Sequence, residues 1–140
     1  MKRVVLVFGA FDLLHEGHRR FFAQARKHGS ELVVCIARDA TIRDLKRQNP
    51  VHRERSRLAR VAALPLVDRA MLGDREHFHR VLQRIRPDVI CLGYDQRPPM
   101  ASGLGQAADA LEKDVRIIRL RAYQPKRYKS SLLRRKRKSR

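Results

Sequence analysis

The sequence predicts an α/β domain built on a doubly wound sheet of five parallel strands. Short apolar segments, the first of them rich in β-branched residues, alternate with segments of helical periodicity. This alternation is typical of successive β-α-β units, whose right-handed crossovers place helices on both faces of one sheet. The chain has 140 residues, which suits one domain of this kind.

The first elements follow from short patterns. Val4–Phe8 is a continuous apolar run, which predicts a buried strand. Residues 17–28 have one apolar face and predict a helix that ends before Gly29. Leu32–Ala37 predicts a second buried strand, and Asp39 is suited to cap a short helix after it.

The middle of the chain begins with a loop at residues 45–52, where Pro50 interrupts any helix. Residues 53–64 have apolar positions at helical spacing and predict a helix. A third strand is predicted at Val67–Leu72 and a further helix at residues 74–86.

Two more strands complete the predicted sheet. They lie at Asp88–Leu92 and Val115–Leu120, with a helix at residues 104–113 between them. Residues 129–138 predict a terminal helix. In a doubly wound sheet ligands bind beyond the carboxyl ends of the strands. The loops expected to form the site therefore lie at residues 9–18, 38–50, 93–103 and 121–131.

The chain is strongly basic, with 33 Lys and Arg against 14 Asp and Glu and a net charge of +19. Residues 126–140 contain nine basic residues and no acidic one. Such a charge attracts nucleic acid, anionic lipid headgroups or phosphorylated small molecules. One hypothesis is therefore an RNA-binding module that uses the basic tail. It is not favoured, because aromatic residues make up 6% of the chain and Trp is absent, which leaves few stacking platforms.

Other features argue against export and membrane insertion. The longest apolar run, Val4–Phe11, is far shorter than the roughly 20 residues of a membrane-spanning helix. The basic start resembles a signal peptide, but no cleavage site of small residues follows. Cys35 and Cys91 lie in apolar runs and predict reduced, buried thiols in a cytoplasmic protein.

The loop after the first strand carries the chemistry. Gly9 allows close approach of the backbone to a ligand, and the N-terminus of the next helix, near Gly17, favours phosphate. His15 and His18 flank this terminus. Their imidazoles are suited to donate hydrogen bonds to phosphate oxygens and to stabilise charge that builds on phosphorus.

The segment GAFDLLHEGH, at residues 9–18, resembles the GxFDxxHxGH signature of the cytidylyltransferase-like branch of the nucleotidyltransferases. The resemblance implies a Rossmann-like sheet and the transfer of a nucleoside monophosphate from a triphosphate to a phosphate, with release of pyrophosphate. Mg²⁺ bound with the triphosphate is implied, and a homodimer is possible. A dedicated protein site for a metal is not expected.

The resemblance also implies roles for individual residues. His15 and His18 would contact the triphosphate. The nucleotide would lie against the backbone of Phe8, Gly9, Ala10, Phe11 and Gly17. Asp12 would lie near the acceptor or its metal, unless it only caps the turn.

Two basic positions are less sharply defined. Lys46 corresponds to a lysine that reaches the α-phosphate, although Arg43 and Arg47 are close alternatives. Arg57 corresponds to an arginine at the start of the next helix, and we expect it to bind the acceptor. Arg53 and Arg55 compete for that assignment.

After the fourth strand, the segment 92–96 (LGYDQ) is similar to the archaeal-type FAD synthases. Gly93 and Asp95 would bind the nucleotide, with the acceptor as the other possible partner of Asp95. Tyr94 would bind the acceptor by stacking on a ring, unless it only packs. This similarity implies ATP and FMN as substrates. The alternative is CTP with glycerol-3-phosphate or a similar small phosphate.

Residues 128–133 (YKSSLL) correspond to a second phosphate-binding signature of the superfamily, at the start of a helix. Tyr128, Ser130 and Ser131 would bind the nucleotide there, unless Ser130 only caps the helix. The arginine of that signature has no direct match, and four basic residues are candidates to replace it: Arg119, Arg121, Lys126 and Arg127. We therefore divide the chain into a nucleotidyltransferase domain at residues 1–128 and a basic tail at 129–140.

Overall fold

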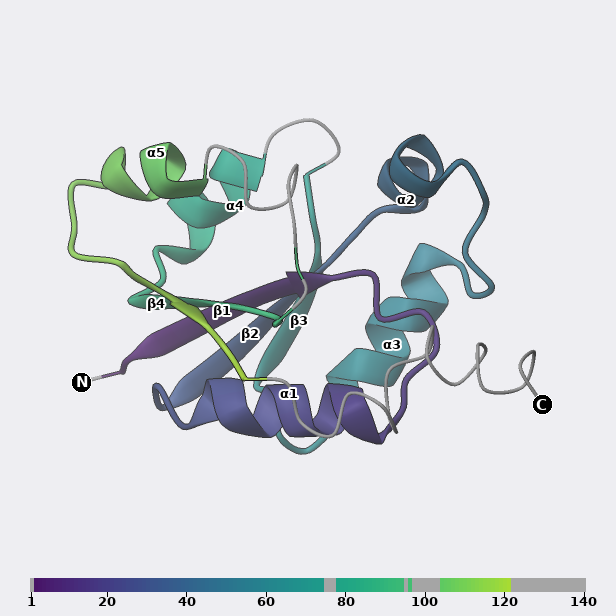
Figure 1. Ribbon diagram of the computed structural model, residues 1–140, viewed down its shortest axis with the longest axis horizontal. Coiled ribbons are helices and arrows are strands. Elements are labelled where there is room, and N and C mark those ends of the chain that lie inside the picture. The colour runs from purple at the N-terminus through teal and green to yellow at the C-terminus, as the bar shows by residue number, and fades with distance from the viewer. Residues whose placement is uncertain (1, 75–77, 95, 97–103, 122–140) are drawn as a thin grey trace.

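Five parallel strands form one sheet in the order β3-β2-β1-β4-β5, which confirms the predicted fold class (Figure 1). The computed structural model describes residues 2–74, 78–94, 96 and 104–121. Its strands are β1 (Val4–Gly9), β2 (Glu31–Ile36), β3 (Arg69–Leu72), β4 (Val89–Leu92) and β5 (Arg116–Arg119). Its helices are α1 (Glu16–Arg26), α2 (Asp39–Lys46), α3 (Glu54–Ala62), α4 (Phe78–Ile85) and α5 (Leu104–Asp109).

The direction of winding reverses beside β1, the central strand. The chain passes outward from β1 to β2 and β3, and then returns to add β4 and β5 on the other side of β1. The carboxyl ends of β1 and β4 therefore border the point where the strand order reverses. Doubly wound sheets bind their ligands at such a point.

Helices cover both faces of the sheet, and side chains alternate along each strand to fill two cores (Figure 1). Val5 and Val7 of β1 belong to the core that includes Phe22 of α1 and Val61 of α3. Leu6, between the two valines, belongs to the opposite core, with residues of α4 and α5. Burying one such side chain stabilises the fold by roughly 1.5–3 kcal/mol, so the two cores hold the strand ends in fixed positions.

The helix predicted at residues 104–113 ends at Asp109 in the structure, as α5. The helix α2 also differs from the sequence prediction. It continues through Lys46, a residue that the sequence places in a loop. The chain leaves this helix at Arg47, which adopts a left-handed conformation with φ 57°. Its N-cap is Arg38 and not Asp39, which is the first residue of the helix. The predicted terminal helix at 129–138 lies outside the described residues.

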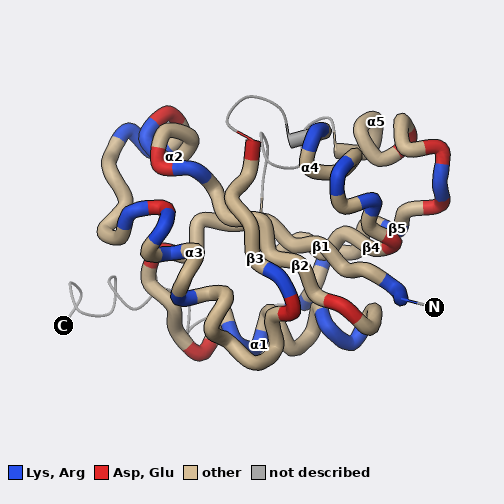
Figure 2. The backbone as a smooth tube through the Cα atoms, turned by 180° about the vertical axis from the view of Figure 1, so that it is seen from behind, with Lys and Arg blue, Asp and Glu red and all other residues tan. Residues whose placement is uncertain are grey.

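The described basic residues are spread over several elements. Figure 2 shows Lys and Arg along α2, α3 and α4, with acidic residues among them on α2 and α3. In the part of the chain that the structure describes, no helix is both long enough and apolar enough to span a membrane. Residues 126–140, which include the basic tail, lie outside the described residues.

Candidate active site at the carboxyl ends of β1 and β4

The backbone that leaves β1 is fixed by three neighbouring segments. Each of three successive carbonyl oxygens accepts a hydrogen bond at 2.9 Å: Phe8 from Gln96 Nε2, Gly9 from the Ala37 N–H and Ala10 from Arg57 Nη1. The next two N–H groups, those of Ala10 and Phe11, have no hydrogen-bond partner among the described residues. The backbone here therefore offers a ligand donors rather than acceptors, which suits an anion.

Phe11 explains why a glycine ends β1. Its φ of 51° is unusual for a residue with a side chain, and its ring is buried. A Cβ at Gly9 would lie 2.6 Å from Cζ of this ring. We predicted that Gly9 leaves room for a ligand, but the space next to it is filled by Phe11. The same ring packs edge-on against His18 at 5.6 Å between centroids, so it also supports the histidine.

His15 and His18 together cap the N-terminus of α1. His15 is the N-cap residue, and its Nδ1 accepts a hydrogen bond from the Gly17 N–H at 3.0 Å. The His15 N–H in turn donates to Nδ1 of His18 at 3.3 Å. The two rings lie 4.1 Å apart between centroids. The N–H of Gly17, which we expected to face phosphate, is therefore occupied by the cap.

These bonds fix the tautomer of both rings. A backbone N–H can only donate, so each Nδ1 must carry a lone pair and each neutral ring carries its proton on Nε2. Burial lowers the pKa of His15. Burial, together with the charge of His15, lowers the pKa of His18 to about 4. At neutral pH the pair therefore presents two neutral Nε2–H donors, and their Nδ1 atoms remain engaged in the cap.

Asp12 joins the loop after β1 to the segment between α2 and α3. Its carboxylate oxygens accept hydrogen bonds from the Val51 N–H at 2.6 Å and from the His52 N–H at 2.8 Å. Hydrogen bonds to a charged acceptor are among the stronger ones in proteins. Each oxygen of Asp12 thus already binds the chain, and its predicted place near the acceptor or its metal remains a prediction.

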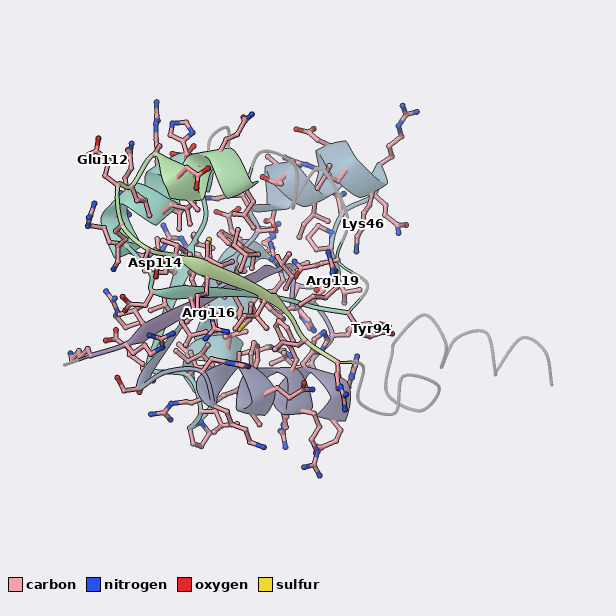
Figure 3. The ribbon with its side chains drawn as sticks, turned by 60° about the vertical axis from the view of Figure 1, so that its left-hand side comes forward. Lys46, Tyr94, Glu112, Asp114, Arg116 and Arg119 are labelled. Atoms are coloured by element: carbon pink, nitrogen blue, oxygen red, sulfur yellow. The ribbon has the colours of Figure 1, made fainter. Side chains whose placement is uncertain are left out.

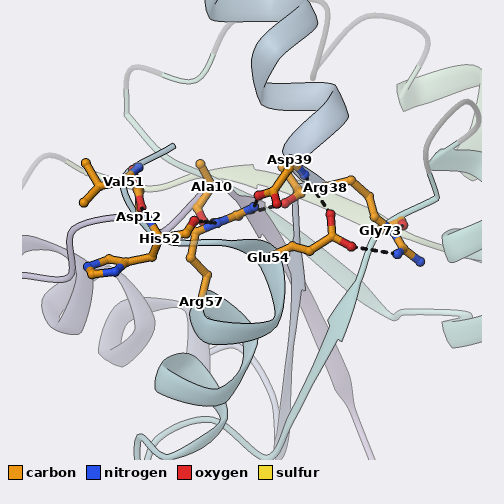
Figure 4. Close-up of polar contacts among 10 residues, drawn as sticks. Ala10, Asp12, Arg38, Asp39, Val51, His52, Glu54, Arg57 and Gly73 are labelled. Atoms are coloured by element: carbon orange, nitrogen blue, oxygen red, sulfur yellow. Dashed lines mark hydrogen bonds and ion pairs between the residues drawn. The ribbon is translucent and has the colours of Figure 1, made fainter. Parts of the chain in front are cut away.

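Arg57 lies behind the site rather than in it. Its side chain has 0% exposure, so its guanidinium cannot reach an acceptor directly in this conformation. It donates to the carbonyl oxygens of Ala10, Ala37 and His52 at 2.7–3.0 Å and to Oδ1 of Asp39 at 2.7 Å (Figure 4). One buried side chain therefore links the ends of β1 and β2 to α2 and α3.

The start of α2 is held by α3. Glu54 accepts the N–H of Asp39 at 2.9 Å and an Nη1 donor of Arg38 at 3.0 Å (Figure 4). Partial burial raises the pKa of the Asp39 carboxyl, but the hydrogen bond and charge of Arg57 outweigh this effect and the net pKa is lowered. Asp39 is therefore an ion-pair partner of Arg57 and not the helix cap that the sequence predicted.

Lys46 is exposed at the last position of α2. In Figure 3 it lies on the same side of the molecule as Tyr94 and Arg119. Tyr94 is 38% exposed and lies two residues after the end of β4. Asp95, Tyr128, Ser130 and Ser131 lie outside the described residues, so their predicted roles remain predictions.

Gln96 and Arg119, for which we predicted no firm role, hold Gly93 at the end of β4. Gln96 accepts the Gly93 N–H through Oε1 at 2.9 Å and donates to Phe8 across the sheet. Arg119 of β5 donates to the carbonyl oxygens of Gly93 and Gln96 at 2.7 and 2.9 Å. Arg119 is one of the four candidates for the arginine of the second signature, and Gln96 ends the LGYDQ segment. Neither position could be assigned this contact from sequence spacing.

No group of three or more His, Cys, Asp or Glu side chains within the described ranges is placed to hold a metal ion. A magnesium ion that arrives with a triphosphate needs few protein ligands, because the phosphates and water supply most of them. Mg²⁺ bound with the nucleotide therefore stays a prediction from the sequence.

Comparisons with known proteins agree with this geometry. The FAD synthases of Thermoplasma volcanium and Thermoplasma acidophilum are 39% and 38% identical over 132 residues, 94% of this chain and 92% of each relative. The FAD synthase of Aciduliprofundum boonei is 46% identical over 93 residues, 66% of this chain but only 62% of that relative. A solved structure, described as a lipopolysaccharide core biosynthesis protein from Thermoplasma volcanium, superposes with a TM-score of 0.81 at 38% identity and covers 89% of this chain and 100% of its own. The sequence profile of the cytidylyltransferase-like family matches residues 6–136, and the chain therefore belongs to this family.

Proposed function

We propose that this protein is an FMN adenylyltransferase, which transfers AMP from ATP to FMN and forms FAD and pyrophosphate. The observation that carries the nucleotidyl transfer is the pair of neutral Nε2–H donors, His15 and His18, at the head of α1. The choice of ATP and FMN rests on the FAD synthases that are similar along nearly the whole chain.

The reaction is an in-line displacement at the α-phosphorus of ATP. An oxygen of the FMN phosphate forms the new bond to this phosphorus, and the bond to the β-phosphate oxygen breaks. Pyrophosphate leaves with the electron pair of that bond. A phosphate monoester is largely dianionic at pH 7, with a second pKa of about 6, so no side chain has to remove a proton from the nucleophile.

The chain supplies position and charge stabilisation. The Nε2–H groups of His15 and His18 donate to phosphate oxygens as negative charge builds on them, and their fixed orientation reduces the reorganisation needed. The N–H groups of Ala10 and Phe11, which have no partner within the described part of the chain, and the dipole of α1 add to this effect. Lys46 supplies a mobile positive charge from the end of α2.

The remaining predicted residues complete the two substrate sites. Tyr94 stacks on the isoalloxazine ring of FMN. Asp95 accepts a hydrogen bond from the ribose of ATP. Tyr128, Ser130 and Ser131 bind the β- and γ-phosphates. Asp12 and Arg57 act on FMN indirectly, because they fix the loops that surround it.

ATP enters as its magnesium complex, and Mg²⁺ neutralises charge on the departing pyrophosphate. In this proposal the metal belongs to the substrate rather than to a protein cage. Cys35 and Cys91 are both buried and unpaired, which fits a protein that works in the reducing cytoplasm.

The test is pyrophosphate release with Mg²⁺, in which ATP and CTP are each combined with FMN and glycerol-3-phosphate. Release with ATP and FMN alone, with FAD as the product, supports the proposal. Release with CTP and glycerol-3-phosphate would replace these substrates and leave the phosphoryl chemistry in place. His18→Ala is the control, since it must abolish release if the pair acts as proposed.

A salt series separates catalysis from the alternative of nucleic-acid binding. Binding to a polyanion through many basic residues weakens steeply with salt, whereas turnover of a small nucleotide changes modestly. If His18→Ala keeps full turnover, the assignment of the histidines is wrong. If the folded protein turns over no nucleotide but binds RNA in a salt-dependent way, the RNA-binding module is the better explanation.

A further inference from the structure

We infer that Gln96 is a positioning residue for the nucleoside half of ATP, because its side-chain amide fixes the loop after β4 against the end of β1. The inference rests on the proposed function, since it identifies ATP as the ligand of this loop. The chemical step itself does not require Gln96, which acts through the backbone of its neighbours.

The amide of Gln96 spans the two strands where their pairing ends. Within the described residues, the register of β1 with β4 runs from Val5 opposite Val89 to Val7 opposite Cys91. Beyond this point Gln96 provides both a donor and an acceptor. Its Nε2 donates to the Phe8 carbonyl of β1, and its Oε1 accepts the Gly93 N–H after β4, each at 2.9 Å. One planar amide therefore bridges the strand ends as a backbone peptide would.

A second restraint comes from β5. Arg119 donates from Nη1 to the carbonyl oxygens of Gly93 and Gln96, and the Gln96 N–H also donates to the Gly93 carbonyl at 3.1 Å. Gly93 and Gln96, the two ends of the turn after β4, are thus bonded to each other and tied to β1 on one side and β5 on the other. Neither residue can move without breaking several hydrogen bonds.

The position of the Gln96 amide in the sheet indicates which ligand it orients. It lies between β1 and β4, where the strand order reverses and doubly wound sheets bind nucleotides. The histidine pair, at the head of α1, is on the chain that leaves the same end of β1. A nucleotide whose phosphates contact the histidines therefore has its ribose and base beside the turn that Gln96 holds.

The chemistry of the amide gives a sharp test. Gln96→Glu keeps the shape of the side chain and an acceptor for the Gly93 N–H. However, it replaces the donor to Phe8 with an anionic oxygen that faces a carbonyl oxygen. Gln83→Glu is the matched control, because Gln83 is exposed on α4 and the change in net charge is the same.

The experiment measures kcat and the KM for ATP and for FMN in the wild type, Gln96→Glu and Gln83→Glu, together with Tm. We expect Gln96→Glu to raise the KM for ATP about tenfold while kcat changes by less than about threefold. This pattern is expected when a mutation weakens binding of the ground state and of the transition state equally. The KM for FMN should rise by less than the KM for ATP, because only Tyr94 of this turn is assigned to FMN, whereas Gly93 and Asp95 are assigned to ATP. Gln83→Glu should match the wild type.

Three results would overturn the inference. They are an unchanged KM for ATP, an equal rise in the KM for FMN, and a fall in kcat at unchanged KM. If Gln96→Glu does not fold, Arg119→Gln removes the second restraint from an exposed position and should raise the KM for ATP in the same direction. A purely structural role of Gln96 would lower Tm and affect both substrates alike.

The two proposals can fail separately. If the wild type makes no FAD, the proposed acceptor is wrong, but calorimetric titration with ATP still tests the positioning role. Weaker ATP binding by Gln96→Glu than by Gln83→Glu would support it. Equal ATP affinities in the two variants would overturn it.

Discussion

The backbone N–H of His15 donates to Nδ1 of His18, while Nδ1 of His15 accepts the Gly17 N–H. The two histidines thus form a reciprocal cap on α1, a position where Ser, Thr, Asp or Asn is more usual. Each ring uses one nitrogen to stabilise the helix and keeps the other for a ligand. The chemistry of the site and the stability of the helix can therefore be separated by substitution.

Comparison of His15→Asn with His15→Ala tests this separation. Asn keeps a side-chain acceptor for the Gly17 N–H but has no donor at the position of Nε2, whereas Ala loses both. We expect both variants to lose turnover by about a hundredfold or more. Only His15→Ala should lose about 1 kcal/mol of stability, as for other lost N-caps. Urea unfolding and FAD formation measure the two effects, and near-wild-type turnover of His15→Asn would contradict the role of Nε2.

His18 should make the protein less stable in mild acid. Its pKa is about 4 in the folded protein and about 6.5 in the unfolded chain. As pH falls from 6.5 to 4 the unfolded state takes up a proton and the folded state does not, so the free energy of unfolding falls, by up to about 3 kcal/mol. Below pH 4 this contribution levels off. Above pH 6.5 the stabilisation from the neutral ring is fully present.

The measurement is the free energy of unfolding in urea between pH 7.5 and pH 4 for the wild type and His18→Gln. The variant should have the flatter pH profile over this interval. His28→Gln, with the same substitution near the other end of α1, is the control and should keep the slope of the wild type. Parallel profiles for the wild type and His18→Gln would contradict the lowered pKa.

Removal of Arg57 should destabilise the whole site. Arg57→Met leaves the carboxylate of Asp39 and three carbonyl oxygens without their donor. Breaking a buried ion pair on one side typically costs about 3–5 kcal/mol. A double-mutant cycle with Asp39→Asn should show coupling of more than about 0.5 kcal/mol, because the two groups interact directly. If the free energy of unfolding of Arg57→Met lies within about 1 kcal/mol of the wild-type value, this role is contradicted, because a change that small is closer to that of an ordinary surface substitution.

Gly9→Ala and Gly105→Ala form a matched pair. A Cβ at Gly9 would lie 2.6 Å from the Phe11 ring, while nothing lies within 4 Å of a Cβ at Gly105. We expect Gly9→Ala to cost about 1–3 kcal/mol from overpacking. Gly105→Ala, in α5, should be neutral or stabilising by up to about 1 kcal/mol. Urea unfolding of both variants is the measurement. Equal stabilities would show that the Phe11 ring can move aside without cost.

Much of the architecture could be predicted from local patterns. The run Val4–Phe8 is apolar on both faces because helices cover both, and its periodicity is visible without any partner. The place of the site could also be predicted, since the spacing of His15 and His18 puts both side chains at the start of one helix. The ends of helices were predicted less accurately. The extension of α2 through Lys46 was not predicted, because no glycine marks the end of this helix.

The sequence by itself determined the order of strands and helices, the sheet type and the histidine loop, since these depend on periodicity and on neighbours a few residues apart. Only the tertiary structure decided the partners of Asp12, Arg57 and Gln96. Their hydrogen bonds join residues that are 39, 47 and 88 positions apart. Local propensity carries no information about such pairs. They form because parallel strands bring their carboxyl ends, and the polar groups left unpaired there, to one edge of the sheet.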